Sequence, residues 1–408
     1  MLRSATSLQD DESRVLQAVF WSGSASRHEL ADLTGFSKTK LNGLVGSLID
    51  DGWLSDGAPR DSSGGRRPAG LELSGSLGYL VGVDLGATSV DIMLSDSNLR
   101  PLATRHAEID VRQGPGPVMA RVSKDVESLL AESQVRPELL RGIGVGVPGP
   151  VEFETGLLIS PPIMPGWEGF SLREHFAASS DAPVFVDNDV NVMALGELWH
   201  ARTTAATPGA RDENWIVVKL GTGIGSGIIA HGDIYRGADG SAGDVGHVCV
   251  DPQGPRCHCG NFGCLEAMAG APAIARAAEQ AARDGLSPFF AARLQEAGVL
   301  DTRDVARAAR EGDPAANAII QEAGGRVGAM LASMVNFFNP SRILIGGGVA
   351  HVGPLMLASI RQSVYGRSLP LSTRKLRLDY TRLGDTAGLR GATALALVEV
   401  LRAGGRPT

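Results

Sequence analysis

The chain has 408 residues, of which 43% are hydrophobic and 20% charged, and its formal net charge is −7. This balance is typical of a globular protein of two or three domains, and it argues against a nucleic-acid coat or a membrane-surface protein. No apolar stretch approaches the roughly 18–20 residues that span a bilayer, and the N-terminus lacks the apolar core of a signal peptide. We therefore expect a cytoplasmic protein with no membrane partner.

The first 75 residues predict a winged helix-turn-helix. Residues 15–20 keep helical spacing in a first helix, and residues 26–29 (Ser-Arg-His-Glu) are a capping-box pattern that starts a second. Ser37 can cap a third helix, whose apolar residues at 41–49 form one helical stripe. Two short strands follow the third helix and flank a basic loop. This order of helices and strands is that of a winged helix-turn-helix.

The residue types of this module favour DNA binding. The exposed start of the third helix would enter the major groove, and the loop arginines would reach the DNA backbone or minor groove. The alternative is a three-helix packing module, because residues 1–75 carry eight Lys/Arg against ten Asp/Glu. However, residues 36–48 contain two lysines and no acid. The predicted DNA contacts are Lys38, Thr39, Lys40, Asn42, Arg66 and Arg67.

From Leu77 onward, apolar strands, glycine turns and Ala-rich helices predict an α/β body. Residues 79–89 and 215–227 resemble each other, because each is a β-rich run that enters a Gly/Thr turn and is followed by another β-rich run. This weak repeat, about 137 residues apart, suggests two lobes facing one cleft. The polar stretch at 201–213 is a plausible crossing between the lobes.

The glycine turns are candidates for phosphate binding, because they present backbone N–H groups with no side chain in the way. Hairpins also need glycine, so the turns carry weight mainly as a set. Asp84, at the end of the first strand, could hold Mg²⁺ through water beside such phosphates. The turn residues are Gly86, Thr88, Gly221, Thr222, Gly223 and, after the apolar strand at 342–345, Gly347.

Four of the five residues at 187–191 are Asp or Asn, and they stand between a predicted strand and a predicted helix. A carboxylate flanked by amides suits polyol recognition and removal of a hydroxyl proton. The alternative is an N-cap cluster, because Asp and Asn are common where helices begin. The pattern alone favours neither interpretation.

All four cysteines fall within 16 consecutive residues, which predicts a metal site and not a disulfide framework. Three thiolates come from Cys257, Cys259 and Cys264, and His247 can complete the tetrahedron that zinc prefers in structural sites. Cys249 is a competing fourth ligand, and His258 a weaker one.

Together these motifs resemble those of the ROK family, whose name stands for repressors, open reading frames and kinases. The resemblance covers about residues 80–401, and the N-terminal module is typical of the family's repressor branch. It is carried by the motifs at 84–88, 144–151, 165–167, 188–191 and 240–247, and by the Cys-x-Cys-Gly-x-x-Gly-Cys-x-Glu run that ends at Glu266.

The resemblance implies an actin-like (ribonuclease H-like), two-lobed sugar-kinase fold behind the winged helix-turn-helix. The expected domains are the DNA-binding module at 1–75, a first lobe at 77–200 to which a C-terminal helix at 386–403 returns, and a second lobe at 214–385 with the zinc motif. Asp189 would be the catalytic base. The implied sugar contacts are Asn188, Asp244, His247, Glu266 and Gly166.

Two functions follow from the resemblance. The first is a sugar-responsive transcriptional regulator that binds operator DNA as a homodimer or higher homo-oligomer. The alternative is an ATP- and Mg²⁺-dependent hexose or N-acetylhexosamine kinase with an appended helix-turn-helix. Ala87 replaces the second glycine usual in the kinases, Ser89 a frequent lysine, and Asp244 the usual glutamate. These departures favour the regulator.

Overall fold

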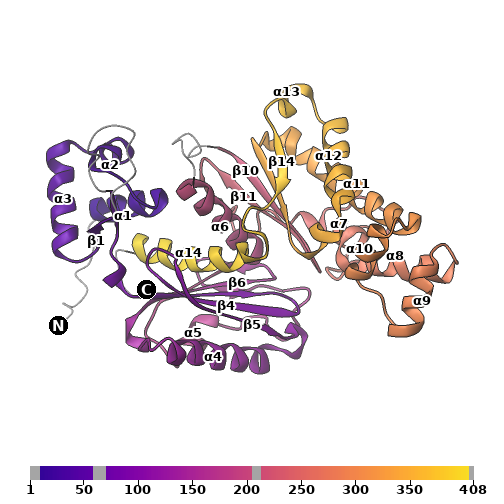
Figure 1. Ribbon diagram of the computed structural model, residues 1–408, viewed down its shortest axis with the longest axis horizontal. Helices are drawn as coiled ribbons and strands as arrows, with labels where there is room; N and C mark the ends of the chain where they lie inside the picture. The colour runs from indigo at the N-terminus through magenta and orange to yellow at the C-terminus, as the bar shows by residue number, and fades with distance from the viewer. Residues whose placement is uncertain (1–9, 58–69, 205–212, 404–408) are drawn as a thin grey trace. The chain divides into compact units, whose positions relative to one another are not determined.

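The computed structural model describes residues 10–57, 70–204 and 213–403, and the chain forms two compact units (Figure 1). Unit 1 comprises residues 1–210 and 388–408, and unit 2 comprises residues 211–387. None of the helices in these described ranges combines the length and apolarity that a bilayer-spanning helix needs.

The N-terminal part of unit 1 contains the three helices and two strands expected from the sequence: α1 (Asp10–Ser22), α2 (Arg27–Thr34), α3 (Lys38–Asp50), β1 (Leu54–Asp56) and β2 (Leu71–Leu73). The capping box of α2 is confirmed, because the Ser26 hydroxyl accepts from the Glu29 N–H at 3.2 Å and the Glu29 carboxylate accepts from the Ser26 N–H at 2.7 Å. The Ser37 hydroxyl caps α3. β1 and β2 pair antiparallel.

The rest of unit 1 is a five-stranded sheet in the order β5-β4-β3-β6-β9. Apolar side chains of this sheet pack on α4 and α5, and α6 and α14 cover its other face (Figure 1). Glycine allows the close approach of that second face, because a β-carbon at Gly144 would overlap the carbonyl oxygen of Ala392 in α14. The elements are β3 (Tyr79–Leu85), β4 (Ser89–Asp96), β5 (Pro101–Glu108), α4 (Pro115–Glu132), β6 (Leu140–Val147), α5 (Leu172–Ala177), β9 (Val184–Asn188), α6 (Asp189–Thr204) and α14 (Ala387–Arg402), with a small hairpin β7 (Val151–Glu152) and β8 (Leu157–Leu158).

Unit 2 contains a second five-stranded sheet in the order β12-β11-β10-β13-β14, packed against helices in one large apolar core. Its strands are β10 (Trp215–Leu220), β11 (Ile224–Ala230), β12 (Asp233–Tyr235), β13 (Arg342–Gly346) and β14 (Arg377–Tyr380). Its helices are α7 (Leu265–Ala269), α8 (Ala271–Arg283), α9 (Pro288–Ala297), α10 (Thr302–Arg310), α11 (Pro314–Phe338), α12 (Pro354–Arg367) and α13 (Pro370–Thr373).

The two sheets have the same topology, which explains the internal repeat. In each, a first strand pairs antiparallel with the next, which pairs antiparallel with a third, and two later strands add in parallel on the other side. The two Gly/Thr turns join equivalent strands, β3 to β4 and β10 to β11. Mixed sheets of this kind with helices are the actin-like α/β architecture that the sequence predicted.

Candidate metal centre and neighbouring site residues

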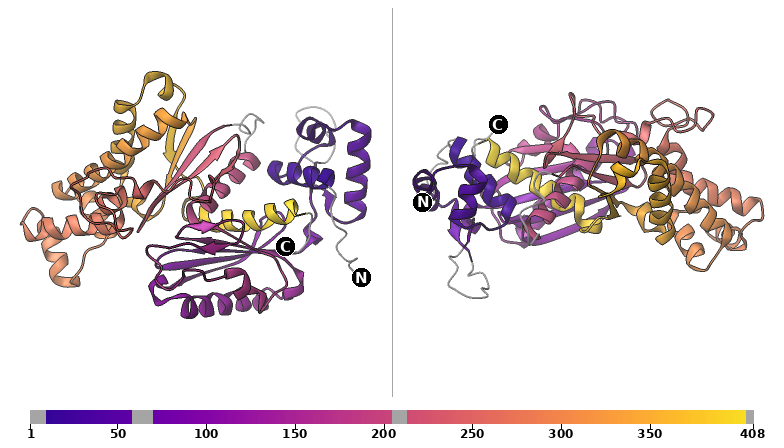
Figure 2. Two further views of the ribbon diagram at one scale, coloured as in Figure 1. Left: turned by 180° about the vertical axis from the view of Figure 1, so that it is seen from behind. Right: turned by 90° about the horizontal axis from the view of Figure 1, so that it is seen from above.

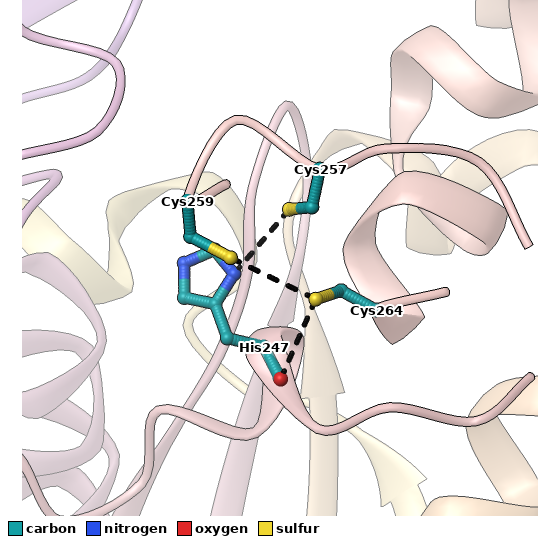
Figure 3. Close-up of side chains that lie close together, drawn as sticks. All are labelled: His247, Cys257, Cys259 and Cys264. Carbon is teal, nitrogen blue, oxygen red and sulfur yellow. Dashed lines mark hydrogen bonds between the residues drawn. The ribbon is translucent and has the colours of Figure 1, made fainter. Parts of the chain in front are cut away.

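Four side chains of unit 2 converge on one point: His247, Cys257, Cys259 and Cys264 (Figure 3). One ligand atom from each lies within 4.8 Å of all the others. His247 ends the short 3₁₀ turn Val245–His247, and Cys264 is the N-cap residue of α7. Gly263, just before Cys264, has a left-handed φ of 65° and lies close to the Asp251 carbonyl oxygen. Only glycine fits here, because a β-carbon would overlap that oxygen.

The distances within the cluster fit a tetrahedral metal ion. Bonds of about 2.3 Å to sulfur and about 2.0–2.1 Å to nitrogen place two sulfurs about 3.8 Å apart, and a sulfur about 3.5–3.6 Å from a nitrogen. The Cys259 and Cys264 sulfurs are 3.7 Å apart, and the Cys257 sulfur is 3.6 Å from His247 Nδ1. Cys249 and His258 are both exposed and do not belong to this group. The geometry therefore favours His247 over the two other candidates.

Two of the three thiols have a raised pKa when no cation lies between them. Burial raises the pKa of Cys264 to about 12, and burial also raises the pKa of Cys257. At Cys259 burial acts in the same direction, but hydrogen bonds from the Asn261 backbone and from the neighbouring thiols outweigh it and lower the pKa. A divalent cation bound here would supply the positive charge that favours the thiolate form of these side chains.

Glu266 links the cluster to the Gly/Thr turn of unit 2. One carboxylate oxygen accepts a hydrogen bond from the Ile224 N–H at 3.1 Å, and the other lies 4.0 Å from the Cys257 sulfur. Burial raises the pKa of Glu266, which the nearby His247 opposes. On the other side of the cluster, His247 Nε2 lies 3.9 Å from the exposed Asp244 carboxylate. His247 thus offers Nδ1 to the cluster and Nε2 toward Asp244.

The glycine turns of the two units are each closed by a backbone hydrogen bond, but the turn of unit 1 is one residue longer. The Gly86 N–H donates to the Ser89 carbonyl at 2.8 Å, and the Gly221 N–H donates to the Gly223 carbonyl at 2.9 Å. In unit 2, Gly347 lies directly beside the second turn's strand, since a β-carbon there would overlap the Leu220 carbonyl. Thr88 and Thr222, the threonines of the two turns, are exposed.

In unit 1, the Asp/Asn cluster serves in part as a helix start. The Asn188 side chain accepts from the Val190 N–H at 2.9 Å and donates to the Gly149 carbonyl at 3.0 Å. Asp187 accepts from the Asn191 amide at 2.8 Å. Asp189 is the first residue of α6 and only 7% exposed. Capping thus accounts for Asn188, and Asp187 is held by the Asn191 side chain, whereas the sequence pattern alone favoured neither capping nor chemistry.

Two further predicted residues in unit 1 lie in defined surroundings. Asp84, at the end of β3, packs against the first turn of α14, where a β-carbon at Gly388 would overlap its carboxylate. Gly166 has a left-handed φ of 81° and precedes the fully buried Trp167, whose indole donates to the Val111 carbonyl at 2.9 Å.

At the candidate DNA surface, Lys38, Thr39 and Asn42 are exposed on α3. Lys40 is already engaged, because its ammonium lies 2.6 Å from the Asp11 carboxylate and 4.3 Å from the centre of the Phe36 ring. Arg66 and Arg67 lie outside the described residues. Sequence reasoning missed Gly43 and Gly46, which continue the exposed face of Thr39 and Asn42 at helical spacing, and whose β-carbons would meet no atom within 4 Å.

Comparisons with known proteins agree with this architecture. The family model "ROK family" matches residues 80–399. The chain is 28% identical to the xylose repressor of Caldicellulosiruptor bescii over 95% of both chains. A solved ROK family transcriptional regulator, a homologue of the E. coli MLC protein, has 28% identity and a TM-score of 0.79 over 97% of this chain and 96% of its own.

A kinase structure matches less of the chain. The ROK family glucokinase from Streptomyces griseus, solved with glucose and AMPPNP, has 31% identity and a TM-score of 0.66. It covers 78% of this chain and 99% of its own length, and the family model likewise begins only at residue 80. The helix-turn-helix is therefore an addition to a body shared with sugar kinases. From the family match over most of its length, the chain belongs to the ROK family.

Proposed function

We propose that this chain is a sugar-responsive, DNA-binding transcriptional repressor. The observation that carries the proposal is the presence of a winged helix-turn-helix and a sugar-kinase-like body in one chain, matched over 95% of its length by a xylose repressor and over 97% by a ROK regulator. A kinase needs no recognition helix, whereas a regulator needs both parts. A repressor acts on DNA, so the proposal places the protein in the cytoplasm.

The proposed ligand of the body is a sugar or sugar derivative. The contacts are those that the family resemblance implies: Asn188, Asp189, Asp244, His247, Glu266 and Gly166. The proposed metal is a structural Zn²⁺ held by His247, Cys257, Cys259 and Cys264. The ion would hold the loop in place and fix the tautomer of His247. A histidine ring that binds a metal through Nδ1 presents its Nε2–H to a neighbouring oxygen.

The proposed DNA partner is a palindromic operator bound by a homodimer. Two recognition helices then occupy successive major grooves, about 34–36 Å apart. Lys38, Thr39 and Asn42 on α3 supply exposed donors at this surface, and Lys40 becomes available only if its pair with Asp11 opens. The wing arginines, Arg66 and Arg67, are proposed to contact the DNA backbone or minor groove.

Fluorescence anisotropy on the full chain tests this function. The probe is a DNA duplex that the protein itself selects from a random pool, and the panel is D-xylose, D-glucose, N-acetylglucosamine and N-acetylmannosamine. We expect one of these sugars to weaken DNA binding, because a ligand shifts a conformational equilibrium by its preference for one state. Glu266→Ala is the control that should keep DNA binding and lose the response. An affinity that no sugar changes contradicts the proposal.

A sugar kinase is the second candidate, and the match to the S. griseus glucokinase favours it. In this case Asp189 accepts a sugar hydroxyl proton, and the turns at Gly86–Thr88 and Gly221–Gly223, with Gly347, hold the nucleotide, with Mg²⁺ near Asp84. Ala87 and Ser89 depart from the kinase pattern at the first turn. A coupled ADP-release assay on the same sugars, with Asp189→Asn as control, decides: turnover above the control supports the kinase.

A further inference from the structure

Two helices of unit 1 begin at residues of the candidate site. α6 starts at Asp189, directly after Asn188, and α14 starts where Gly388 abuts the Asp84 carboxylate. Ligand contacts at these residues therefore act first on α6 and α14.

The two helices lie side by side on one face of the sheet (Figures 1 and 2), and glycines allow close approach between them and the sheet. A β-carbon at Gly391 of α14 would overlap the carbonyl oxygen of Val192 in α6. Gly146 of β6 faces the Val192 side chain in the same close manner. Every α6 residue from Asp189 to Leu198 is buried. Because such close-packed interiors shift as rigid pieces, a displacement at one end of α6 is carried along it and shared with α14.

The far ends of both helices contact α1, the first helix of the DNA-binding module. The Arg202 guanidinium in the last turn of α6 lies over the Trp21 ring, 4.5 Å from its centre. The methyl group of Thr203 lies 3.3 Å from where a β-carbon at Gly23 would be. On α14, the Leu401 carbonyl accepts a hydrogen bond from the buried Ser13 hydroxyl of α1. The 16 residues of α6 span about 24 Å, so one helix reaches from Asp189 to the module.

A second set of contacts also joins the module to the body. At the end of β2, the Leu73 carbonyl accepts from the Asn98 amide at 2.9 Å, and the Ser74 carbonyl accepts from the Ser97 hydroxyl at 2.7 Å. Ser97 and Asn98 lie at the β4–β5 connection, and neither is a candidate site residue. This tether anchors the module, whereas the α6 and α14 contacts join it to the site.

We propose that the α6–α14 pair is the element that transmits ligand occupancy at Asn188–Asp189 to the winged helix-turn-helix, through Arg202–Trp21 and Leu401–Ser13. This inference rests on the proposed function. Sugar binding repositions the start of α6, and the α6–α14 pair moves as one body. Helix α1 follows because its Trp21 and Ser13 contact the last turns of α6 and α14. The stacked Arg202 and Trp21 are positioning residues and touch neither sugar nor DNA in this scheme.

The test measures the coupling factor, which is the DNA dissociation constant with saturating sugar divided by that without. The probes are the self-selected duplex and the most effective sugar of the D-xylose, D-glucose and N-acetylhexosamine panel. Wild-type coupling between two sites is typically about 5–150-fold. We expect Arg202→Gln and Trp21→Leu to lower the factor toward one while sugar affinity and sugar-free DNA affinity stay within about threefold. Arg202→Lys and Trp21→Phe, which keep a cation and a ring, should restore most of it.

Asn98→Ala is the matched control, because it removes a contact between module and body outside the helix pair. It should keep the wild-type factor. Reciprocity supplies a second readout: the factor by which DNA weakens sugar binding must fall equally in Arg202→Gln. A wild-type factor of one overturns the proposed function and this inference together. A wild-type response that persists in Arg202→Gln and Trp21→Leu, or that only Asn98→Ala removes, overturns the helix route alone and leaves the repressor standing.

Discussion

The candidate metal loop of unit 2, residues 245–264, and the candidate recognition helix α3 of unit 1 present their functional side chains in opposite ways. In the loop, four side chains turn inward until their ligand atoms lie within 4.8 Å of one another. On α3, the apolar residues Leu41, Val45 and Leu48 are buried, and Thr39, Asn42 and Gly43 face solvent.

This difference decides how each site responds to change. Convergent residues bind the same ion. Removing one of them weakens the binding of that ion by all the others, so the loss of binding free energy is large and cooperative. Divergent residues each meet a separate part of a partner, so their losses are small, roughly independent and sensitive to salt. The following experiments test that contrast, from the largest expected effect to the smallest.

Cys259→Ser should have the largest effect, because structural zinc contributes about 10–16 kcal/mol of apparent binding free energy in small sites. We expect metal analysis to show loss of zinc and thermal unfolding to show a lower midpoint together with weaker sugar binding. Cys249→Ser is the matched control, since Cys249 is exposed and outside the cluster. Wild-type protein purified without zinc, or equal metal loss in both variants, would contradict the convergent site.

Glu266→Ala should separate the sugar from the metal. The carboxylate is not a member of the four-ligand cluster, but it joins the Cys257 sulfur to the Ile224 N–H. Glu266 is a proposed sugar contact, and a hydrogen bond to a charged group contributes about 1.5–3 kcal/mol, which is about 10–150-fold in affinity. We therefore expect zinc to remain near the wild-type level and sugar affinity, measured by calorimetry, to fall by about that factor. Unchanged sugar affinity would remove Glu266 from the site.

The same contrast explains what could be predicted from sequence. Cys257, Cys259 and Cys264 lie close along the chain, so spacing alone indicated their convergence. The sequence favoured His247 as the fourth ligand but kept Cys249 and His258 as competitors, since only the path of the loop decides which imidazole or thiol faces inward. The repeat of strand, turn and strand likewise indicated two lobes, whereas the pairing of the strands within each sheet does not follow from it.

Contacts between distant segments could not be predicted in this way. The pairing of Lys40 with Asp11 joins α3 to α1 across 29 positions, and nothing in the local pattern around either residue announces it. The stacking of Arg202 on Trp21 joins residues 181 positions apart. Such pairs depend on how helices cross, and binary patterning specifies which faces are apolar but not which charged side chains meet at their edges.

Lys38 and Lys40 should therefore differ although both stand in the first turn of α3. Lys38→Ala should reduce the salt dependence of DNA binding by about 0.9 in the slope of log K against log salt, as for one lost phosphate contact. Lys40→Ala should leave that slope unchanged. Because both members of its pair with Asp11 are partly exposed, its loss should cost at most about 1 kcal/mol of stability. Anisotropy at several salt concentrations measures the slopes, and the reverse order would show that Lys40 leaves Asp11 to bind DNA.

Substitutions at Gly43 and Gly46 should have the smallest effects, and these should be opposite in sign for stability and for DNA affinity. Each glycine in a helix interior costs about 0.5–1 kcal/mol of stability relative to alanine. Neither has an atom within 4 Å of where a β-carbon would be, so packing within the chain does not require them. A surface that brings its helix backbone close to another molecule does require them. We expect Gly43→Ala and Gly46→Ala to stabilise the protein by about that amount and to weaken DNA binding.

Gly325 provides the control, because it lies inside α11 of unit 2 with equally open surroundings. Gly325→Ala should give the same stabilisation, measured by denaturant unfolding, with unchanged DNA affinity. If all three variants stabilise the chain and none alters DNA binding, then α3 approaches DNA through its side chains alone. The other outcome is that only the α3 variants weaken DNA binding while they stabilise the fold. In that case Gly43 and Gly46 lower the stability of the protein but allow the backbone of α3 to lie close to the DNA.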